Sequence, residues 1–307
     1  MTADVAVIVV TYNSAAYIRS CLDSVCSQGS ELKLQIVVVD NASTDETTRI
    51  IRGEYPDVEL LKSEENLGFA RGVNFGAQHG DAEFILLLNP DARVSEGAID
   101  KLVRFARTNP EYGVYGGRAL KGDGSLEPSS CWAFPTLWSM AMFSCGLSTL
   151  FPGSRWLNPE RMPQWERDTI REVGFVSGCF LLVTVEVWKQ LGGLDERYFM
   201  YGEDADFGLR ARAAGYRSVI CPEATVTHEI GASSATKGSK LRLLFRGKAT
   251  LIRTHWRGGG RSVALFFLVA GAWLRASLAK VGMTFRGRSA EGWRELWQTR
   301  REWIAGY

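Results

Sequence analysis

Residues 36–45 read Ile-Val-Val-Val-Asp-Asn-Ala-Ser-Thr-Asp. The first four residues are an uninterrupted apolar run of strand length, and the carboxylate of Asp40 follows it directly. A run without polar alternation is typical of a strand that is covered on both faces, as in the parallel sheets of α/β proteins. Ser43 and Glu46 then form the pattern of a capping box, which predicts the start of a helix. A buried strand followed at once by a helix is the repeating unit of a doubly wound sheet.

The same alternation extends on both sides of this stretch. Further strands are expected at residues 5–10, 58–61, 84–88 and 218–221, and helices at 15–25, 98–105, 185–191 and 209–215; residues 174–182 form a further apolar stretch. We therefore expect an α/β fold with a mainly parallel, doubly wound sheet.

Acidic residues follow the apolar runs at the expected strand ends. Asp40 and Asp91 each come after such a run, a third acidic cluster spans residues 203–206, and one of only three histidines is His228. Ligands of open α/β sheets bind at the carboxyl ends of strands. Carboxylates gathered there suit a hard divalent cation and an anionic substrate such as a diphosphate.

Charge divides the 307 residues into two parts. Residues 237–307 contain 15 Lys and Arg against 3 Asp and Glu, whereas residues 1–236 contain 21 against 31. We expect a catalytic domain at 1–236, with a nucleotide-binding half at about 1–117 and an acceptor half at about 118–236. The basic, aromatic region at 237–307 is expected to be helical and to meet an anionic partner.

Two uncharged segments bear on membrane contact. Residues 132–151 contain no charge, and we expect either a mobile apolar segment near the acceptor or lipid, or a buried structural insertion. Residues 263–274 are apolar for 12 positions, which is shorter than a membrane span requires. Basic residues and recurring tryptophans in the tail favour contact with an anionic membrane surface; packing on the catalytic domain is the alternative. No motif supports nucleic-acid binding.

The six cysteines show no C-x-x-C pair and no zinc spacing, which predicts free thiols in a reducing compartment. The N-terminus enters a strand without a basic and apolar leader. We expect a cytoplasmic protein that is peripheral on the inner face of the cell membrane. Association with a second copy of the chain stays open.

Five motifs together carry a resemblance to a known family. They are Val9-Val10-Thr11-Tyr12-Asn13, Val39-Asp40-Asn41-Ala42-Ser43-Thr44-Asp45, Asn66-Leu67-Gly68-Phe69-Ala70, Asn89-Pro90-Asp91 and Tyr201-Gly202-Glu203-Asp204-Ala205-Asp206. In this order and spacing they resemble the inverting GT-A glycosyltransferases of family 2, and among these the bacterial rhamnosyltransferases. The resemblance covers residues 4–235 and implies the GT-A fold of nucleotide-diphospho-sugar transferases.

The resemblance assigns the nucleotide-sugar site to the first strand ends. Asp40 corresponds to the carboxylate that accepts from N3–H of the pyrimidine base; a helix-capping role is the alternative. Thr11, Tyr12 and Asn13 would contact the nucleoside. Asn66, Gly68 and Arg71, together with Asn89, would lie along the diphosphate and sugar, although a packed glycine-rich turn at 66–71 would give the same pattern.

Asn89-Pro90-Asp91 stands where the family has its D-x-D metal motif, with Asn in place of the first Asp. The resemblance implies that Asp91 binds Mn²⁺ or Mg²⁺, and that His228 is a second ligand rather than a structural histidine. An imidazole ligand suits Mn²⁺ better than Mg²⁺. The cation would neutralise the charge that grows on the leaving diphosphate.

The acidic cluster corresponds to the family's catalytic motif. Asp204 would deprotonate the acceptor hydroxyl, while Glu203 and Asp206 orient it or bind the acceptor. An acidic helix start that complements the helix dipole is the alternative interpretation. We expect an enzyme that transfers L-rhamnose from dTDP-L-rhamnose to a hydroxyl of a glycan or of a polyprenyl-diphosphate-linked saccharide. Alternatives are a UDP-hexose or UDP-galactofuranose donor, or a non-catalytic sugar-nucleotide binder in a membrane assembly.

Overall fold

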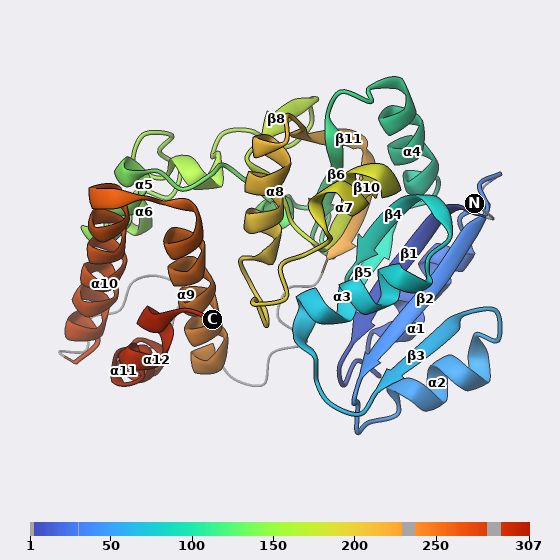
Figure 1. Cartoon of the computed structure of the whole chain (residues 1–307), viewed down its shortest axis with the longest axis horizontal. Helices are drawn as coiled ribbons and strands as arrows, with labels where there is room; N and C mark the ends of the chain where they lie inside the picture. The colour runs from blue at the N-terminus through green and yellow to red at the C-terminus, as the bar shows by residue number, and fades with distance from the viewer. Residues whose placement is uncertain (1–2, 30, 229–236, 281–289) are drawn as a thin grey trace. The chain divides into compact units, whose positions relative to one another are not determined.

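A computed structural model describes residues 3–29, 31–228, 237–280 and 290–307 (Figure 1). Contacts within the chain define two units. The sheet unit contains residues up to Trp132, Glu166–Glu196 and the segment from Asp204; the helical unit contains Ala133–Trp165, Arg197–Glu203 and the C-terminal helices. Residues 229–236, which include the domain boundary expected at residue 236, lie outside the described residues.

The N-terminal half of the sheet unit is parallel. Its strands lie in the order β3-β2-β1-β4, and Val9 of β1 pairs with Val38 on one side and Leu88 on the other. The strands are β1 (Ala3–Thr11), β2 (Leu34–Asn41), β3 (Glu59–Ser63) and β4 (Ala82–Leu88). Because these strands are parallel, their carboxyl ends lie along one edge and place the first two acidic positions close to each other.

Helices cover both faces of this half. Val5, Val7 and Val9 of β1 join the core that includes α1, whereas Ile8 faces α3. Gly76 permits that second contact, since a Cβ there would lie 2.8 Å from a methyl group of Ile8. The helices are α1 (Ile18–Cys26), α2 (Thr47–Glu54), α3 (Gly68–His79) and α4 (Ala98–Thr108). The expected doubly wound arrangement is confirmed.

The capping box expected at Ser43 and Glu46 is wrong. The helix α2 begins at Thr47, and its first amide donates to Oδ1 of Asp45 at 3.0 Å. Ser43 instead accepts a hydrogen bond from the amide of Asn13 at 2.9 Å. A long-range contact therefore takes the hydroxyl that the local pattern assigned to the helix.

Antiparallel strands enter the second half of the sheet. β10 pairs antiparallel with β4 and β6, and β11 pairs parallel with β6 and antiparallel with β5 and β8. A separate pair joins β7 and β9. The elements are β5 (Ala92–Val94), β6 (Gly113–Leu120), η1 (Pro128–Ser130), β7 (Cys131–Trp132), β8 (Arg171–Val173), β9 (Phe175–Val176), β10 (Phe180–Thr184), α7 (Val185–Leu191), α8 (Glu203–Ala213) and β11 (Arg217–His228).

The helical unit has an aromatic core of its own. The ring of Phe245 lies 5.9 Å from that of Trp293 and 5.2 Å from that of Trp303, and all three side chains are buried. Two of the tail tryptophans are therefore core residues. The helices are α5 (Leu137–Ser144), α6 (Leu147–Leu150), η2 (Pro159–Arg161), α9 (Lys237–His255), α10 (Gly258–Lys280), α11 (Ala290–Gln298) and α12 (Arg300–Ala305).

The uncharged segment at 132–151, except for Trp132, belongs to this unit. It forms α5 and α6, and Met140 packs into the same core as Phe245. The expectation of a structural insertion thus holds for its buried side. Trp138 and Phe151, however, are more than half exposed.

Residues 263–274 were expected to be too short to cross a membrane. This expectation is wrong when the length and composition of the whole helix that contains them are considered. The helix α10 continues on both sides for 23 residues in all, and it is long and apolar enough for a span. The apolar run ends at Arg275, but the helix does not, because the guanidinium is buried and hydrogen-bonded to carbonyl groups of Phe143 and Gly271. Core helices of soluble proteins also meet these criteria.

Candidate functional site

Asp40 is a buried carboxylate at the end of β2. Its Oδ1 accepts from the hydroxyl of Thr11 at 3.2 Å, and its Oδ2 accepts from the amide of Ser43 at 3.1 Å. Only 1% of the residue is exposed. Because α2 starts seven residues later, Asp40 caps no helix. Each oxygen retains a lone pair with which it could accept from a ligand.

Asn13 organises the loop that follows Asp40. Its backbone is left-handed, with φ of 50°, and its Oδ1 accepts from the amides of Thr44 at 2.8 Å and Asp45 at 3.3 Å. The neighbouring Tyr12 is 43% exposed. The family resemblance assigned both residues to the nucleoside, yet Asn13 already uses its carbonyl oxygen within the protein, whereas the ring of Tyr12 has an exposed face for contact.

The segment 66–71 is a packed turn. Oδ1 of Asn66 accepts from the amide of Gly68 at 2.9 Å, and the carbonyl of Gly68 accepts from Asn41 at 2.9 Å. Gly68 has φ of 79°, which favours glycine. Arg71 is about half exposed and lies 3.8 Å from the carboxylate of Glu65. The alternative of a glycine-rich turn therefore explains Asn66 and Gly68, and Arg71 is the member with a cation to offer.

Asp91 and His228 are brought together from strands 137 positions apart in the chain. The end of β11 pairs with the start of β5, so that Nε2 of His228 lies 3.3 Å from Oδ1 of Asp91. Nδ2 of Asn89 lies 3.4 Å from the same nitrogen. Both the imidazole and the Asp91 carboxylate are at most 10% exposed.

The cluster of Asp91, His228 and Asn89, called the cation corner below, could hold a divalent cation. Two ligands of an octahedral ion with bonds of 2.0–2.1 Å are separated by about 3 Å, which is close to the Asp91–His228 separation. Among the described residues, no group of three or more His, Cys, Asp and Glu side chains is arranged to hold a metal ion. Asp91 and His228 would therefore supply two coordination positions and leave the others to water and substrate oxygens. Nδ1 of His228 is buried and has no hydrogen-bond partner among the described residues.

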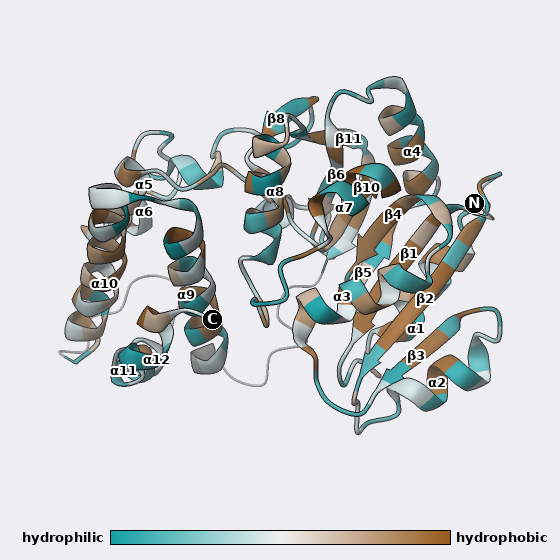
Figure 2. Cartoon of the chain, in the orientation of Figure 1, coloured by the Kyte–Doolittle hydropathy of each residue, from teal (hydrophilic) through white to brown (hydrophobic). Residues whose placement is uncertain are grey.

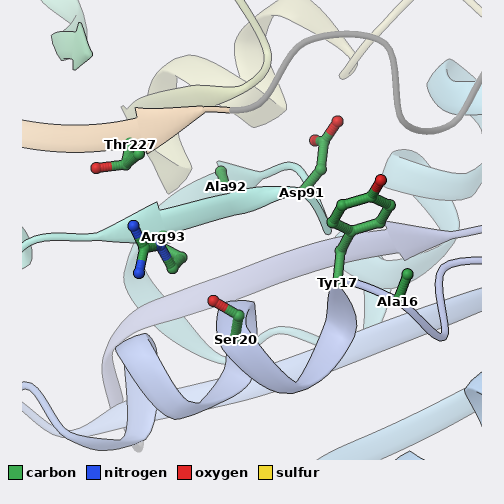
Figure 3. A pocket seen from close by; sticks show the side chains of 7 residues that line it. All are labelled: Ala16, Tyr17, Ser20, Asp91, Ala92, Arg93 and Thr227. Atoms are coloured by element: carbon green, nitrogen blue, oxygen red, sulfur yellow. The ribbon is translucent and has the colours of Figure 1, made fainter. Parts of the chain in front are cut away.

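Asp91 also lines an open pocket of about 260 Å³ (Figure 3). In that view Tyr17 lies beside Asp91 at one end, and Ser20, Arg93 and Thr227 lie at the other. The guanidinium and the hydroxyl groups are donors that could hold an anionic group next to the cation corner. Asp91 is the one member of this lining that a sequence motif marked, because the other members come from the start of α1 and the residues before it, from β5 and from β11.

Asp204 is at the start of α8. Burial raises the pKa of its carboxyl to about 6, while hydrogen bonds from the backbone N–H groups of Ala205, Asp204 itself and Gly178 oppose the rise. The amide of Ala205 lies 2.8 Å from Oδ1. A carboxylate with a pKa near the operating pH is suited to take a proton from a hydroxyl group.

The loop before β10 connects the cation corner with Asp204. The amide of Asn89 donates to the carbonyl of Cys179 at 3.2 Å, and the preceding Gly178 donates to Asp204. Burial raises the pKa of the Cys179 thiol to about 12, and the charges of Asp91 and Asp204 add to the rise. The negative charges of both carboxylates therefore act on one buried thiol. The sequence predicted only an apolar strand here.

Asp206 forms an ion pair in the first turns of α8. It is fully buried, and its Oδ2 accepts from Nε of Arg210 at 2.7 Å. Arg210 also donates to the carbonyls of Leu191 at 2.7 Å and Gly193 at 2.9 Å. The ion pair thus ties the first turn of α8 to the end of α7 and leaves little of the Asp206 carboxylate for an acceptor.

The turn before Asp204 is held within the helical unit. Tyr201 has φ of 70°, and the hydroxyl of Tyr307 donates to the carbonyl of Met200 at 2.8 Å. At Gly247 of α9, a Cβ would lie 1.9 Å from the carbonyl oxygen of Tyr201. Glu203, the last residue of this segment, is buried. The contribution of Tyr307 and Gly247 could not be found from sequence spacing, since they follow Tyr201 by 106 and 46 positions.

Comparisons with known proteins match most of the chain. A model described as "Glycosyl transferase family 2" matches residues 6–187, and one described as "Glycosyl transferase family group 2" matches residues 164–307. The N-acetylglucosaminyl-diphospho-decaprenol L-rhamnosyltransferase of Mycobacterium tuberculosis is 36% identical over 239 residues, which are 74% of this chain and 76% of that protein.

Solved structures share the fold. The mannosyltransferase PcManGT from Pyrobaculum calidifontis, solved with GDP-Man and Mn²⁺, has a TM-score of 0.57 at 19% identity and is matched over 99% of this chain and 84% of its own. GalNAc-T7, solved with UDP, GalNAc and Mn²⁺, has a TM-score of 0.62 at 14% identity over 98% of this chain. This chain spans 54% of the GalNAc-T7 chain and 43% of that of TarS from S. aureus.

Proposed function

Because the chain belongs to glycosyltransferase family 2, we propose that it transfers L-rhamnose from dTDP-L-rhamnose, with inversion, to a hydroxyl group of a polyprenyl-diphosphate-linked saccharide. The observation that carries the proposal is the pairing of Asp91 with His228, together with the Gly178–Cys179 loop that contacts both Asn89 and Asp204, in a chain that is 36% identical to a mycobacterial rhamnosyltransferase. Such an enzyme acts in the synthesis of cell-envelope polysaccharide.

Asp204 is the proposed general base. As the acceptor oxygen forms its bond to the anomeric carbon, the hydroxyl proton passes to the Asp204 carboxylate. The bond from the anomeric carbon to the diphosphate oxygen breaks, and dTDP leaves on the opposite face. One proton is thereby gained by Asp204, and the electron pair of the broken bond stays on the diphosphate. Glu203 and Asp206 orient the start of α8 on which the base lies.

Asp91 and His228 are the proposed metal ligands, with Asn89 beside them. Bound there, Mn²⁺ or Mg²⁺ would offset the negative charge of the leaving diphosphate. The imidazole favours Mn²⁺. Arg71, together with Arg93 and the hydroxyl groups of the adjoining pocket, supplies further positive charge and hydrogen-bond donors.

Asp40 is the proposed reader of the nucleotide base. Its carboxylate accepts from N3–H of thymine or uracil, and the exposed ring of Tyr12 offers a surface against the nucleoside. Cytosine has no N3–H, so the buried Asp40 acceptor disfavours it. Since thymine and uracil share this group, Asp40 does not select between dTDP and UDP donors.

A donor panel tests the proposal. Nucleotide release is measured with dTDP-L-rhamnose, UDP-galactofuranose and UDP-glucose, with a polyprenyl-diphosphate N-acetylglucosamine acceptor and Mn²⁺ present. We expect acceptor-dependent release from dTDP-L-rhamnose, and release at least about 100-fold slower in the Asp204→Asn variant. Turnover of a UDP donor alone would replace the donor assignment. Binding without turnover of any donor would favour a non-catalytic sugar-nucleotide binder in a membrane assembly.

The cellular location follows from the proposed acceptor. Polyprenyl diphosphates are anchored in a bilayer, and nucleotide sugars are cytoplasmic metabolites, so the reaction would occur at the inner face of the cell membrane. Peripheral association with that surface is proposed for the helical unit, whose C-terminal region has the excess of positive charge.

A further inference from the structure

Exposed apolar side chains are concentrated in the helical unit. Among the described residues, ten large apolar side chains are at least 41% exposed, and eight of them belong to this unit. Five come from 133–165 and three from α10: Leu137, Trp138, Leu150, Phe151, Trp156, Val263, Phe266 and Trp273. The two source segments pack on each other, because α5 contacts α10. Single exposed apolar residues need no explanation, but a collection on one unit marks an interaction surface.

The helix α10 has two apolar faces. Its buried face includes Ala264, Leu268 and Ala272, which join the core of the helical unit. Val263, Phe266, Ala270 and Trp273 follow the i, i+3, i+7, i+10 pattern of one helical stripe on the opposite side. Figure 2 shows the hydrophobic residues along α10. The core explains only the first of these two faces.

Positive charge accompanies this surface. The helix α10 contains no acidic residue; Arg257 and Arg261 are exposed at its start, and Lys280 is exposed at its end. Within 133–165, Glu160 is the only acid, and it is paired with Lys248 and bonded to the hydroxyl of Ser139. The guanidinium of Arg155 lies 5.0 Å from the ring centre of Trp156.

We propose that this surface, formed by the outer stripe of α10 and the exposed residues of 133–165, rests in the headgroup region of an anionic membrane. The proposal rests on the proposed function, which requires a lipid-linked acceptor. Tryptophan and phenylalanine flanked by arginine and lysine are the composition of helices that lie in a membrane interface. Insertion of the stripe removes its apolar area from water, and the cations attract anionic lipids.

The helix lies along the membrane and does not cross it. Arg275, in the C-terminal half of α10, is fully enclosed: its guanidinium donates to Phe143 at 2.9 Å, Gly271 at 3.0 Å and the hydroxyl of Thr149 at 3.0 Å. It also lies 4.0 Å from the ring centre of Phe143. A spanning α10 would have to leave these partners and place the charge in hydrocarbon, which is costly.

The test measures binding of the full chain to vesicles of phosphatidylcholine with and without phosphatidylglycerol. The Val263→Ser, Phe266→Ser, Trp273→Ser triple variant should bind anionic vesicles at least about 30-fold more weakly. Arg257→Gln should lower binding to anionic vesicles about fivefold and leave binding to neutral ones unchanged. Ile170→Ser, which removes an exposed apolar side chain of the sheet unit, is the matched control and should change neither.

Three outcomes overturn the proposal. The first is that the triple variant binds vesicles as well as wild type does. The second is that wild type is a dimer and the triple variant a monomer, while neither binds vesicles. The third is that wild-type protein in bacterial membranes resists extraction by alkaline carbonate. The second would identify the stripe as an interface between copies, and the third would identify α10 as a span.

Failure of the proposed function is recognised separately. Transfer to an acceptor with a short, water-soluble prenyl chain should be the same in wild type and the triple variant, because the stripe contains no site residue. Vesicle binding that follows the prediction in a protein that transfers no sugar would refute the function and support the surface. Transfer without vesicle binding would refute the surface and support the function.

Discussion

Replacement of Asp204 by Asn should slow transfer at least about 100-fold and, at the same time, stabilise the protein. Burial raises the pKa of this carboxyl from 3.8 to about 6, so its charged form is held at a cost in the folded state. A shift of about 2 pH units corresponds to at most about 3 kcal/mol. Asn has the same shape, keeps an oxygen for the Ala205 amide, and carries no charge.

The stability effect has a definite pH dependence. Below the ordinary pKa of 3.8, the carboxyl is protonated in both the folded and the unfolded state, so wild type and variant should be equally stable. Between this value and about 6 the unfolded chain ionises first, and the wild type loses stability relative to the variant as pH rises. Above about 6 the difference is constant, and the melting temperature of the variant should be higher by roughly 5 °C.

The kinetic effect follows from the same group. The base must be ionised, so wild-type kcat/KM should fall about tenfold per pH unit below about 6 and be level above it. The Asp204→Asn variant should lose about 100-fold to 10,000-fold in kcat. Asp57→Asn, in the exposed turn after α2, is the control and should change neither property.

Thermal melts from pH 4 to pH 8 and initial rates of dTDP release are the assays. Retained turnover in Asp204→Asn would show that Asp204 is not the base. If the variant is less stable than wild type at pH 8, the surroundings stabilise the Asp204 carboxylate. That result would refute the argument that burying this charge lowers the stability of the folded protein.

Four further predictions concern the other parts of the site. His228→Ala should raise the Mn²⁺ concentration for half-maximal activity about 10-fold to 100-fold, as measured by metal titration, with unchanged melting temperature without metal. Asp40→Asn should raise the KM for dTDP-L-rhamnose about tenfold, because an amide at this position offers N3–H a weaker acceptor; an unchanged KM would argue against base contact. Tyr307→Phe loses the hydrogen bond to the Met200 carbonyl and should lower kcat about threefold to tenfold with little change in donor KM. Gly178→Ala should lower kcat and stability together, since its Cβ would lie 2.8 Å from the ring of Phe69; a fully active variant would show that the loop can move.

The sheet and most site residues could be predicted from local patterns. The valine runs of β1 and β2 and the helix at 185–191 have the periods of their elements, and α7 has the bounds expected for it. The polar residues after β1, β2 and β4 come from strand ends, which in a parallel sheet share one edge. For this reason the sequence alone could place Thr11 and Asp40, which are 29 positions apart, next to each other.

Other expectations depended on packing and were changed by it. Ser43 appeared to cap α2, but the loop places its hydroxyl at the amide of Asn13. Arg275 appeared to end an apolar run, but carbonyl groups of its own and a neighbouring helix make the charge compatible with burial. In each case a partner distant in sequence outweighed the local preference of the residue.

Short-range period and motif were enough to predict the order of most strands and helices and the family, and to propose Asp40, Asp91, Asp204 and His228 as site residues. The way in which these motifs are joined emerges only when the elements pack. The Gly178–Cys179 loop reaches both carboxylate sites, and Tyr307 holds the turn before the base. Such contacts join residues from 26 to 107 positions apart, and no local pattern encodes them, since their free energy arises from the packing of separate elements.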